Sequence, residues 1–168
     1  MTVYLIGPSG VGKTTCARTA SRVLPVKHID IDSLCLRNAY DWSACRLVLA
    51  GLEDPIDDPW ILNLIDIGAG TQTLPELRDY LLKRREHVVL VWAPESEVIQ
   101  RNPLGPERSR DEYHLTEYAN RQQLYAIAPH RINVEGVDGA EAGRVLADFL
   151  LRTFIDLPGG SATSPPVF

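Results

Sequence analysis

Five short apolar runs, several of them rich in β-branched residues, divide the chain at fairly regular intervals. We expect each of these runs to form a β-strand, at residues 2–6, 26–31, 60–67, 87–92 and 130–134. The segments between them favour helices, at residues 13–23, 33–52 in broken form, 74–85, 94–101, 111–127 and 138–153. Strands that alternate with helices are typical of an α/β fold, in which helices cover both faces of a parallel sheet. The carboxyl ends of the strands, and any ligand, are then expected at one edge of the sheet.

Three stretches interrupt this alternation. Residues 53–59 form an acidic turn, and residues 102–110 combine two prolines, a glycine and two arginines, which is typical of a mobile loop. From Pro158 onward the chain is rich in Gly, Ser and Pro. We therefore predict a single domain over residues 1–155 and a flexible C-terminal tail over 156–168.

Composition and charge exclude several classes of partner. The chain of 168 residues is 45% hydrophobic and 23% charged, which is ordinary for a globular protein. Its net charge of -5, without a block of Lys or Arg, argues against nucleic acid or an anionic membrane as partner. The sequence contains no run of about 18 apolar residues, so it predicts no membrane-spanning helix. We expect a monomer or weak homodimer.

The cysteines and histidines give no metal signature. Cys16, Cys35 and Cys45 are odd in number and lack CxxC spacing, which favours buried free thiols in a reducing cytoplasm. The four histidines are scattered and predict no zinc site.

The strongest motif is GPSGVGKT at residues 7–14, between the first predicted strand and the first predicted helix. Its glycines let successive backbone N–H groups turn toward phosphate oxygens, and the following helix directs its positive end at the anion. Lys13 is expected to reach the β- and γ-phosphates of ATP, and the Thr14 hydroxyl to bind Mg²⁺. The expected nucleotide-binding residues are Gly7, Ser9, Gly10, Val11, Gly12, Lys13, Thr14 and Thr15.

Acidic residues follow the second and third predicted strands. Asp30 and Asp32 end the second strand, and period-two alternation places them on the same face. One could order Mg²⁺ while the other binds or deprotonates an acceptor hydroxyl. Alternatively, Asp32 caps the next helix and Asp30 is a solvated strand end. Asp66 ends the third strand in the manner of a Walker B motif and competes with Asp30 for the metal.

A glycine-containing turn and several arginines complete the candidate site. The turn Gly68-Ala69-Gly70 could let backbone N–H groups approach a substrate closely. Arg121, near the end of an amphipathic helix, suits a carboxylate, although a solvated surface position is the alternative. A closing lid could bring Arg101, Arg108 or Arg110 onto the transferring phosphoryl group.

Together these motifs resemble shikimate kinase, within the nucleoside monophosphate kinase-like group of P-loop kinases. The resemblance covers most of residues 2–155 and implies a three-layer fold with a five-stranded parallel sheet in the order 2-3-1-4-5. It implies that Asp32 binds the acceptor hydroxyl and that Asp30 helps to order Mg²⁺. Residues 68–70 would line the acceptor pocket, Arg121 would hold the acceptor carboxylate, and Arg101 would be the lid or adenine-side arginine.

The chain also departs from the shikimate kinase pattern. Ala69 replaces the middle glycine of the turn, the lid is shortened, and the region between Asp32 and Gly68 is short. The substrate arginine usual in that region has no clear counterpart, and Arg37 and Arg46 are the candidates there.

The sequence therefore predicts an ATP- and Mg²⁺-dependent kinase that phosphorylates a hydroxyl of a small, carboxylate-bearing metabolite. Lys13, Asp32 and Arg101 are the expected catalytic residues, and Arg108 is expected to contact the nucleotide. One alternative is a kinase of the same fold for a sugar acid, a nucleoside or an antibiotic. Another is a nucleotide-dependent switch ATPase without a small acceptor, although no NKxD motif for guanine is present.

Overall fold

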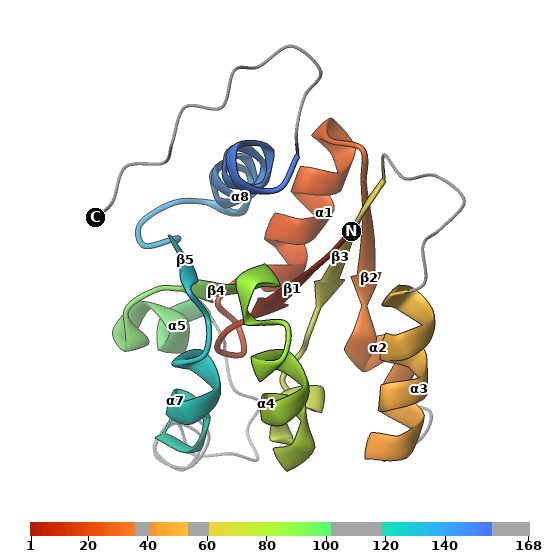
Figure 1. The fold of residues 1–168 in the computed structure, drawn as a ribbon. Coiled ribbons are helices and arrows are strands. Elements are labelled where there is room, and N and C mark those ends of the chain that lie inside the picture. Colours follow the sequence, from red (N-terminus) through yellow and green to blue (C-terminus); the bar gives the residue numbers. More distant parts are fainter. Residues whose placement is uncertain (36–40, 54–60, 102–118, 156–168) are drawn as a thin grey trace.

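The core of the protein is a five-stranded parallel sheet with the strand order β2-β3-β1-β4-β5 (Figure 1), the order that the resemblance to shikimate kinase implied. The computed structural model describes residues 1–35, 41–53, 61–101 and 119–155. The strands are β1 (Thr2–Ile6), β2 (Val26–Asp30), β3 (Leu62–Asp66), β4 (Val88–Trp92) and β5 (His130–Asn133).

Helices connect the strands and cover both faces of the sheet (Figure 1). They are α1 (Lys13–Val23), α2 (Ile31–Cys35), α3 (Trp42–Glu53), α4 (Pro75–Leu82), α5 (Glu95–Arg101), α7 (Ala119–Tyr125) and α8 (Gly139–Thr153). Two single-turn 3₁₀ helices, η2 (Thr71–Thr73) and η3 (Arg85–His87), lie on either side of α4.

Strand β1 shows why the predicted runs are continuously apolar. Val3 and Leu5 face a core formed with α1 and α8, whereas Tyr4 and Ile6 face a second core formed with α2, α3, α4 and α7. Because side chains alternate along a strand, a sheet covered on both faces needs apolar residues at every position. The two cores make the sheet a rigid base for its carboxyl-terminal edge.

Close contact between α1 and α8 fixes the start of α1. A Cβ atom on Gly139 would lie 2.6 Å from Thr15 Cγ2, and one on Gly143 would lie 2.2 Å from Thr19 Cβ. Asp138 caps α8 by accepting hydrogen bonds from the backbone N–H groups of residues 140 and 141. The N-terminus of α1, which follows the GPSGVGKT motif, is thereby held in place.

One prediction about β2 was wrong. The strand ends at Asp30, and Ile31 already begins α2, so Asp30 and Asp32 do not share a strand face. Helical geometry has replaced period-two alternation at the point where the Asp30 carboxylate caps α2. The expected broken helix at 33–52 is confirmed as α2 and α3.

Some predictions concern residues outside the described ranges. They include residues 102–110, residues 111–118 of the predicted sixth helix, the tail 156–168, and most of the acidic turn at 53–59. Of the longer predicted helix 111–127, the described part is α7.

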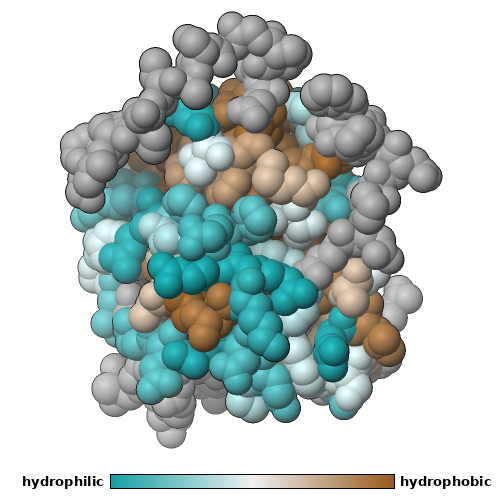
Figure 2. Space-filling model, in the orientation of Figure 1, coloured by the Kyte–Doolittle hydropathy of each residue, from teal (hydrophilic) through white to brown (hydrophobic). Residues whose placement is uncertain are grey.

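The three cysteines are buried and free, as expected from their spacing. The surface in Figure 2 is largely hydrophilic over its lower half, with a few apolar patches, as is usual for a globular protein. Within the described ranges, no helix combines the length and apolar character needed to cross a membrane.

Candidate functional site

Residues 7–12 of the GPSGVGKT motif form a loop between β1 and α1, and Lys13 and Thr14 begin α1. Gly10 and Gly12 have φ angles of 77° and 104°, in the left-handed region that side chains disfavour. Gly7 is required for space as well, since a Cβ there would lie 2.3 Å from the backbone oxygen of Val91 in β4. The motif therefore has the backbone geometry of a phosphate-binding loop.

Lys13 lies inside this loop rather than in solvent. Its side chain is 6% exposed, and Nζ donates hydrogen bonds to the carbonyl oxygens of Gly7 (2.9 Å) and Pro8 (3.0 Å). Burial lowers the pKa of Lys13 below its ordinary value, although the nearby carboxylate of Asp66 opposes this shift. The loop thus encloses an amine whose present partners are neutral carbonyls.

Thr14 contacts Asp66 at the carboxyl end of β3. The Thr14 hydroxyl donates a 2.5 Å hydrogen bond to Asp66 Oδ2, and Asp66 is 1% exposed. Burial acts to raise the pKa of Asp66, but His28, Lys13 and Thr14 together outweigh it and hold this pKa below its usual value. His28 Nε2 lies 3.8 Å from Asp66 Oδ2, so this contact is electrostatic rather than a hydrogen bond.

Asp30 has a different environment. Its carboxylate accepts hydrogen bonds from the backbone N–H of Ser33 (3.2 Å) and from the Ser33 hydroxyl (2.8 Å). Asp30 is therefore the N-cap of α2, which the sequence suggested for Asp32 instead. Of the two carboxylates considered for the metal, Asp66 is the one in contact with Thr14.

Asp32 is held by the turn after β3. Its Oδ2 accepts a hydrogen bond from the Gly70 N–H (2.8 Å), and Oδ1 accepts one from the Thr71 N–H (3.0 Å). Gly68 makes this approach possible, since a Cβ on Gly68 would lie 2.4 Å from Asp32 Cγ. The turn 68–70 thus orients a carboxylate, a role that sequence reasoning did not assign to its N–H groups.

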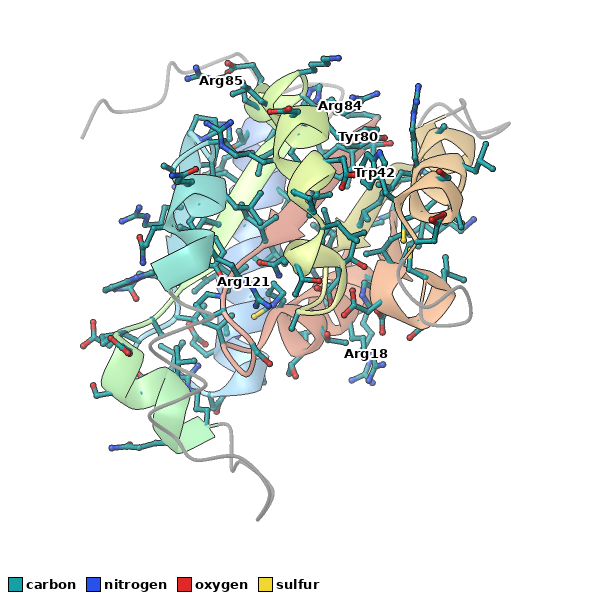
Figure 3. All side chains as sticks on the ribbon, turned by 90° about the horizontal axis from the view of Figure 1, so that it is seen from below. Arg18, Trp42, Tyr80, Arg84, Arg85 and Arg121 are labelled. Atoms are coloured by element: carbon teal, nitrogen blue, oxygen red, sulfur yellow. The ribbon has the colours of Figure 1, made fainter. Side chains whose placement is uncertain are left out.

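Arg121 is also anchored to this turn. The side chain is 5% exposed, and Nη2 donates a hydrogen bond to the Ala69 carbonyl oxygen (2.9 Å). Figure 3 looks onto the edge of the sheet where the strands end and shows Arg121 in the interior, beside α7 and the loop before α1. The alternative of a solvated surface arginine is therefore excluded for this position.

Four charged groups influence one another at this edge. Burial is the main cause that lowers the pKa of Lys13; Asp66 and Asp32 oppose this shift, and Arg121 adds to it. The site thus combines two cationic and two anionic side chains, which come from α1, α7, β3 and α2.

Gln72 was not singled out from the sequence. This residue is 5% exposed, and its Nε2 donates hydrogen bonds to the carbonyl oxygens of Gly7 (3.1 Å) and Ile67 (2.7 Å). Gln72 therefore joins the start of the phosphate-binding loop to the turn that holds Asp32. A polar residue in a predicted loop gives no sequence signal for such a bridge.

Arg101 does not lie free at the edge of the site. Its guanidinium donates to the carbonyl oxygens of Val11 (3.3 Å), Val134 (2.9 Å) and Val137 (3.0 Å), and it pairs with Glu97. These contacts tie the phosphate-binding loop to the segment between β5 and α8. The expected lid arginines Arg108 and Arg110 and the candidate Arg37 lie outside the described residues, and Arg46 is exposed on α3.

A cavity of about 340 Å³ adjoins Arg121. It lies between η2 and α4 on one side and α7 on the other. Its lining residues are Gln72, Thr73, Leu74, Pro75, Arg78, Arg121, Gln123 and Leu124.

Comparisons with known proteins identify the fold. No protein-family model matches the chain, and neither does any curated protein sequence. Among solved structures, shikimate kinase from Bacteroides thetaiotaomicron matches 89% of this chain and 98% of its own, with a TM-score of 0.67 and 18% identity. Shikimate kinase from Acinetobacter baumannii, solved in complex with shikimate, matches 92% and 95%, with a TM-score of 0.63 and 19% identity.

A third similar structure is not that of a shikimate kinase. The tunicamycin resistance protein from Deinococcus radiodurans matches 88% of this chain and 94% of its own, with a TM-score of 0.63 and 18% identity. The resemblance to shikimate kinase-like P-loop kinases is thus confirmed at the level of the fold. At these identities the chemistry must be argued from the site itself.

Proposed function

We propose that this protein is an ATP-dependent kinase that transfers the γ-phosphoryl group to a hydroxyl of a small, carboxylate-bearing metabolite. The observation that supports this most is the presence of two sets of groups at one edge of the sheet. Lys13 and the Thr14–Asp66 pair suit the nucleotide, whereas Asp32 and Arg121 are fixed by the same turn and suit an acceptor.

On the donor side, the loop and Lys13 would hold the triphosphate. Anionic phosphate oxygens attract the Lys13 ammonium by their charge as well as by hydrogen bonds, whereas its present partners are two neutral carbonyls. We therefore expect the amine to turn from Gly7 and Pro8 to the phosphates when ATP binds. There it would stabilise the charge that develops on the transferring group.

The donor set also fits Mg²⁺. Thr14 and Asp66 provide a hydroxyl and a carboxylate, the oxygen ligands that Mg²⁺ prefers, and Asp66 Oδ1 is buried without a hydrogen-bond partner in the described part of the chain. Bound there, Mg²⁺ would neutralise charge on the β- and γ-phosphate oxygens. We favour Asp66 over Asp30 for this role because Asp30 caps α2.

On the acceptor side, Asp32 would orient the hydroxyl and Arg121 the carboxylate. Two backbone N–H groups fix the plane of the Asp32 carboxylate, yet each oxygen keeps a lone pair for a further hydrogen bond. The acceptor oxygen would form a bond to the γ-phosphorus while the bond from that phosphorus to ADP breaks. The hydroxyl proton would pass to Asp32.

Arg101 is better suited to positioning than to catalysis. Its donors are directed at three carbonyl oxygens and at Glu97, none of which belongs to a substrate. We propose that it holds the loop after β5 against the phosphate-binding loop. This replaces the catalytic role that the sequence suggested.

We also propose that residues 1–155 act as one cytoplasmic domain, followed by the tail 156–168. The structural matches span 94–98% of the lengths of the shikimate kinase and resistance-protein chains, which supports one domain with the fold of those chains.

The test is ADP formation with a panel of hydroxy acids, sugars and nucleosides as acceptors. We expect at least one hydroxy acid to stimulate ADP formation by the wild-type protein, and Lys13→Met to reduce this rate by about 100-fold or more. Lys27→Met removes the same charge from an exposed position on β2 and should leave the rate unchanged. Normal turnover by Lys13→Met would contradict the proposal.

A further inference from the structure

The cavity between α4 and α7 has a composition that points to an anionic ligand. Two arginines, Arg78 from α4 and Arg121 from α7, belong to its lining, and none of its lining residues in the described ranges is acidic. This is notable in a chain whose net charge is -5. At about 340 Å³, the cavity is at the small end of the range of about 300–1,000 Å³ for small-molecule sites.

The two arginines differ in how firmly they are held. Arg121 is 5% exposed and hydrogen-bonded to the turn after β3. The Arg78 side chain is 45% exposed and lies 3.5 Å from Asp79, a surface contact that stabilises little and can be exchanged for a ligand. Arg78 is therefore able to turn toward an anion that enters the cavity.

The cavity borders the turn that forms the acceptor side of the site. Gln72 and Thr73 line it and directly follow the turn 68–70, whose Gly70 N–H orients Asp32. Arg121 both lines the cavity and contacts Ala69 of the same turn. An acceptor whose hydroxyl meets Asp32 and whose carboxylate meets Arg121 would therefore extend toward Arg78.

We propose that this cavity receives a second anionic group of the acceptor, which makes Arg78 a specificity-determining residue. The substrate class is then a hydroxy acid with two separated anionic groups, the second being a carboxylate or a phosphate. A guanidinium binds either group through two parallel hydrogen bonds, and the Gln123 amide in the lining offers a further N–H donor. This inference rests on the proposed function for its acceptor, but it can be tested without turnover.

Three probes with the same carbon chain separate the possibilities. D-Gluconate has one carboxylate, D-glucarate has two, and 6-phospho-D-gluconate has a carboxylate and a phosphate. Their binding would be measured by isothermal titration calorimetry without nucleotide, for the wild type, Arg78→Gln and Arg85→Gln. Arg85 is a matched control because it is exposed, loses the same charge and lies at the opposite end of α4 from Arg121 (Figure 3).

We expect glucarate or 6-phosphogluconate to bind the wild type at least about fivefold more tightly than gluconate, a modest factor because Arg78 is half-exposed. Arg78→Gln should abolish this advantage, and Arg85→Gln should keep it. The probe with the larger gain in affinity over gluconate identifies the second anionic group as a carboxylate or a phosphate. Equal affinity for all three probes, no binding of any, or an advantage that survives Arg78→Gln would overturn the inference.

Failure of the proposed function would give a different result. In that case no acceptor would stimulate ADP formation, whereas the preference for a second anion would still be measured by calorimetry. Conversely, phosphorylation of monoanionic acceptors with no effect of Arg78→Gln would leave the kinase assignment intact and reject the second anion site.

Discussion

The Thr14 hydroxyl donates a 2.5 Å hydrogen bond to the buried carboxylate of Asp66. This contact joins the first turn of α1 to the end of β3 and places an oxygen pair next to Lys13. The same contact distinguishes Asp66 from Asp30. Asp30 lies opposite Asp66 in the β2–β3 register, but its carboxylate binds Ser33 instead of Thr14. We therefore propose that the metal is held by Asp66, the carboxylate that the sequence treated as the competitor of Asp30.

The first prediction distinguishes these two carboxylates. Asp66→Asn should lower the affinity for Mg²⁺, so that half-maximal activity requires at least about tenfold more metal, because a neutral amide is a weaker ligand than a carboxylate. Asp30→Asn should leave the Mg²⁺ requirement unchanged, with at most about 1 kcal/mol lost in stability from the weaker cap of α2. A metal requirement that changes in Asp30→Asn and not in Asp66→Asn would reverse the assignment.

The second prediction concerns pH. The pKa of Asp66 is lower in the folded protein than its unfolded value of about 3.9, so folding favours the ionised form. The stability that this provides is complete above the unfolded pKa and is lost as the pH falls toward the folded pKa. The free energy of unfolding, measured by urea titration between about pH 5 and pH 2, should therefore depend less on pH for Asp66→Asn than for the wild type.

Asp148 provides the control for this experiment. It is an exposed carboxylate on α8 that pairs with Arg152 at the surface. Asp148→Asn should follow the wild-type pH dependence closely. Parallel curves for the wild type and Asp66→Asn would mean that Asp66 is not stabilised in its ionised form.

The third prediction tests the contact between Gly68 and Asp32. A methyl group at residue 68 would lie 2.4 Å from Asp32 Cγ, so Gly68→Ala must displace the carboxylate or the turn. We expect at least a tenfold loss of turnover, since misplacement by about 1 Å can cost 100-fold. Gly51→Ala is the matched control, because a Cβ there meets nothing within 4 Å, and it should stabilise α3 by about 0.5–1 kcal/mol without affecting turnover.

The fourth prediction concerns Gln72. Gln72→Leu would remove the hydrogen bonds to the carbonyl oxygens of Gly7 and Ile67, and we expect a loss of about 1–3 kcal/mol together with weaker ATP binding. Chemical denaturation and a nucleotide titration would measure the two effects. Gln122→Leu, at an exposed position of α7, should change stability by less than about 0.5 kcal/mol. Unchanged ATP affinity in Gln72→Leu would limit Gln72 to a structural role.

The fold could be predicted because its signals are local. The alternation of apolar runs with helical periods predicted the parallel sheet, and GPSGVGKT located the phosphate-binding loop between β1 and α1. The residues of β1 are buried on both faces of the sheet, which is why the strand is continuously apolar. The apolar run of this one strand therefore indicates that helices cover both faces.

The details of the site could not be predicted because they depend on contacts between distant residues. Whether Asp30 or Asp66 meets Thr14 depends on where β2 ends. The Asp30 carboxylate caps α2 by binding Ser33, so β2 ends one residue earlier than the apolar pattern suggests. Likewise, nothing local shows that Gln72 reaches Gly7, 65 residues earlier in the chain.

The most direct test of the central claim is ³¹P NMR of a reaction that contains ATP, Mg²⁺ and the hydroxy acid that best stimulates ADP formation. The account predicts a phosphomonoester signal that grows together with ADP, with little inorganic phosphate, and that is absent with Lys13→Met. Inorganic phosphate released at the same rate with or without the acceptor, and no phosphomonoester, would contradict the account and indicate a nucleotide hydrolase instead.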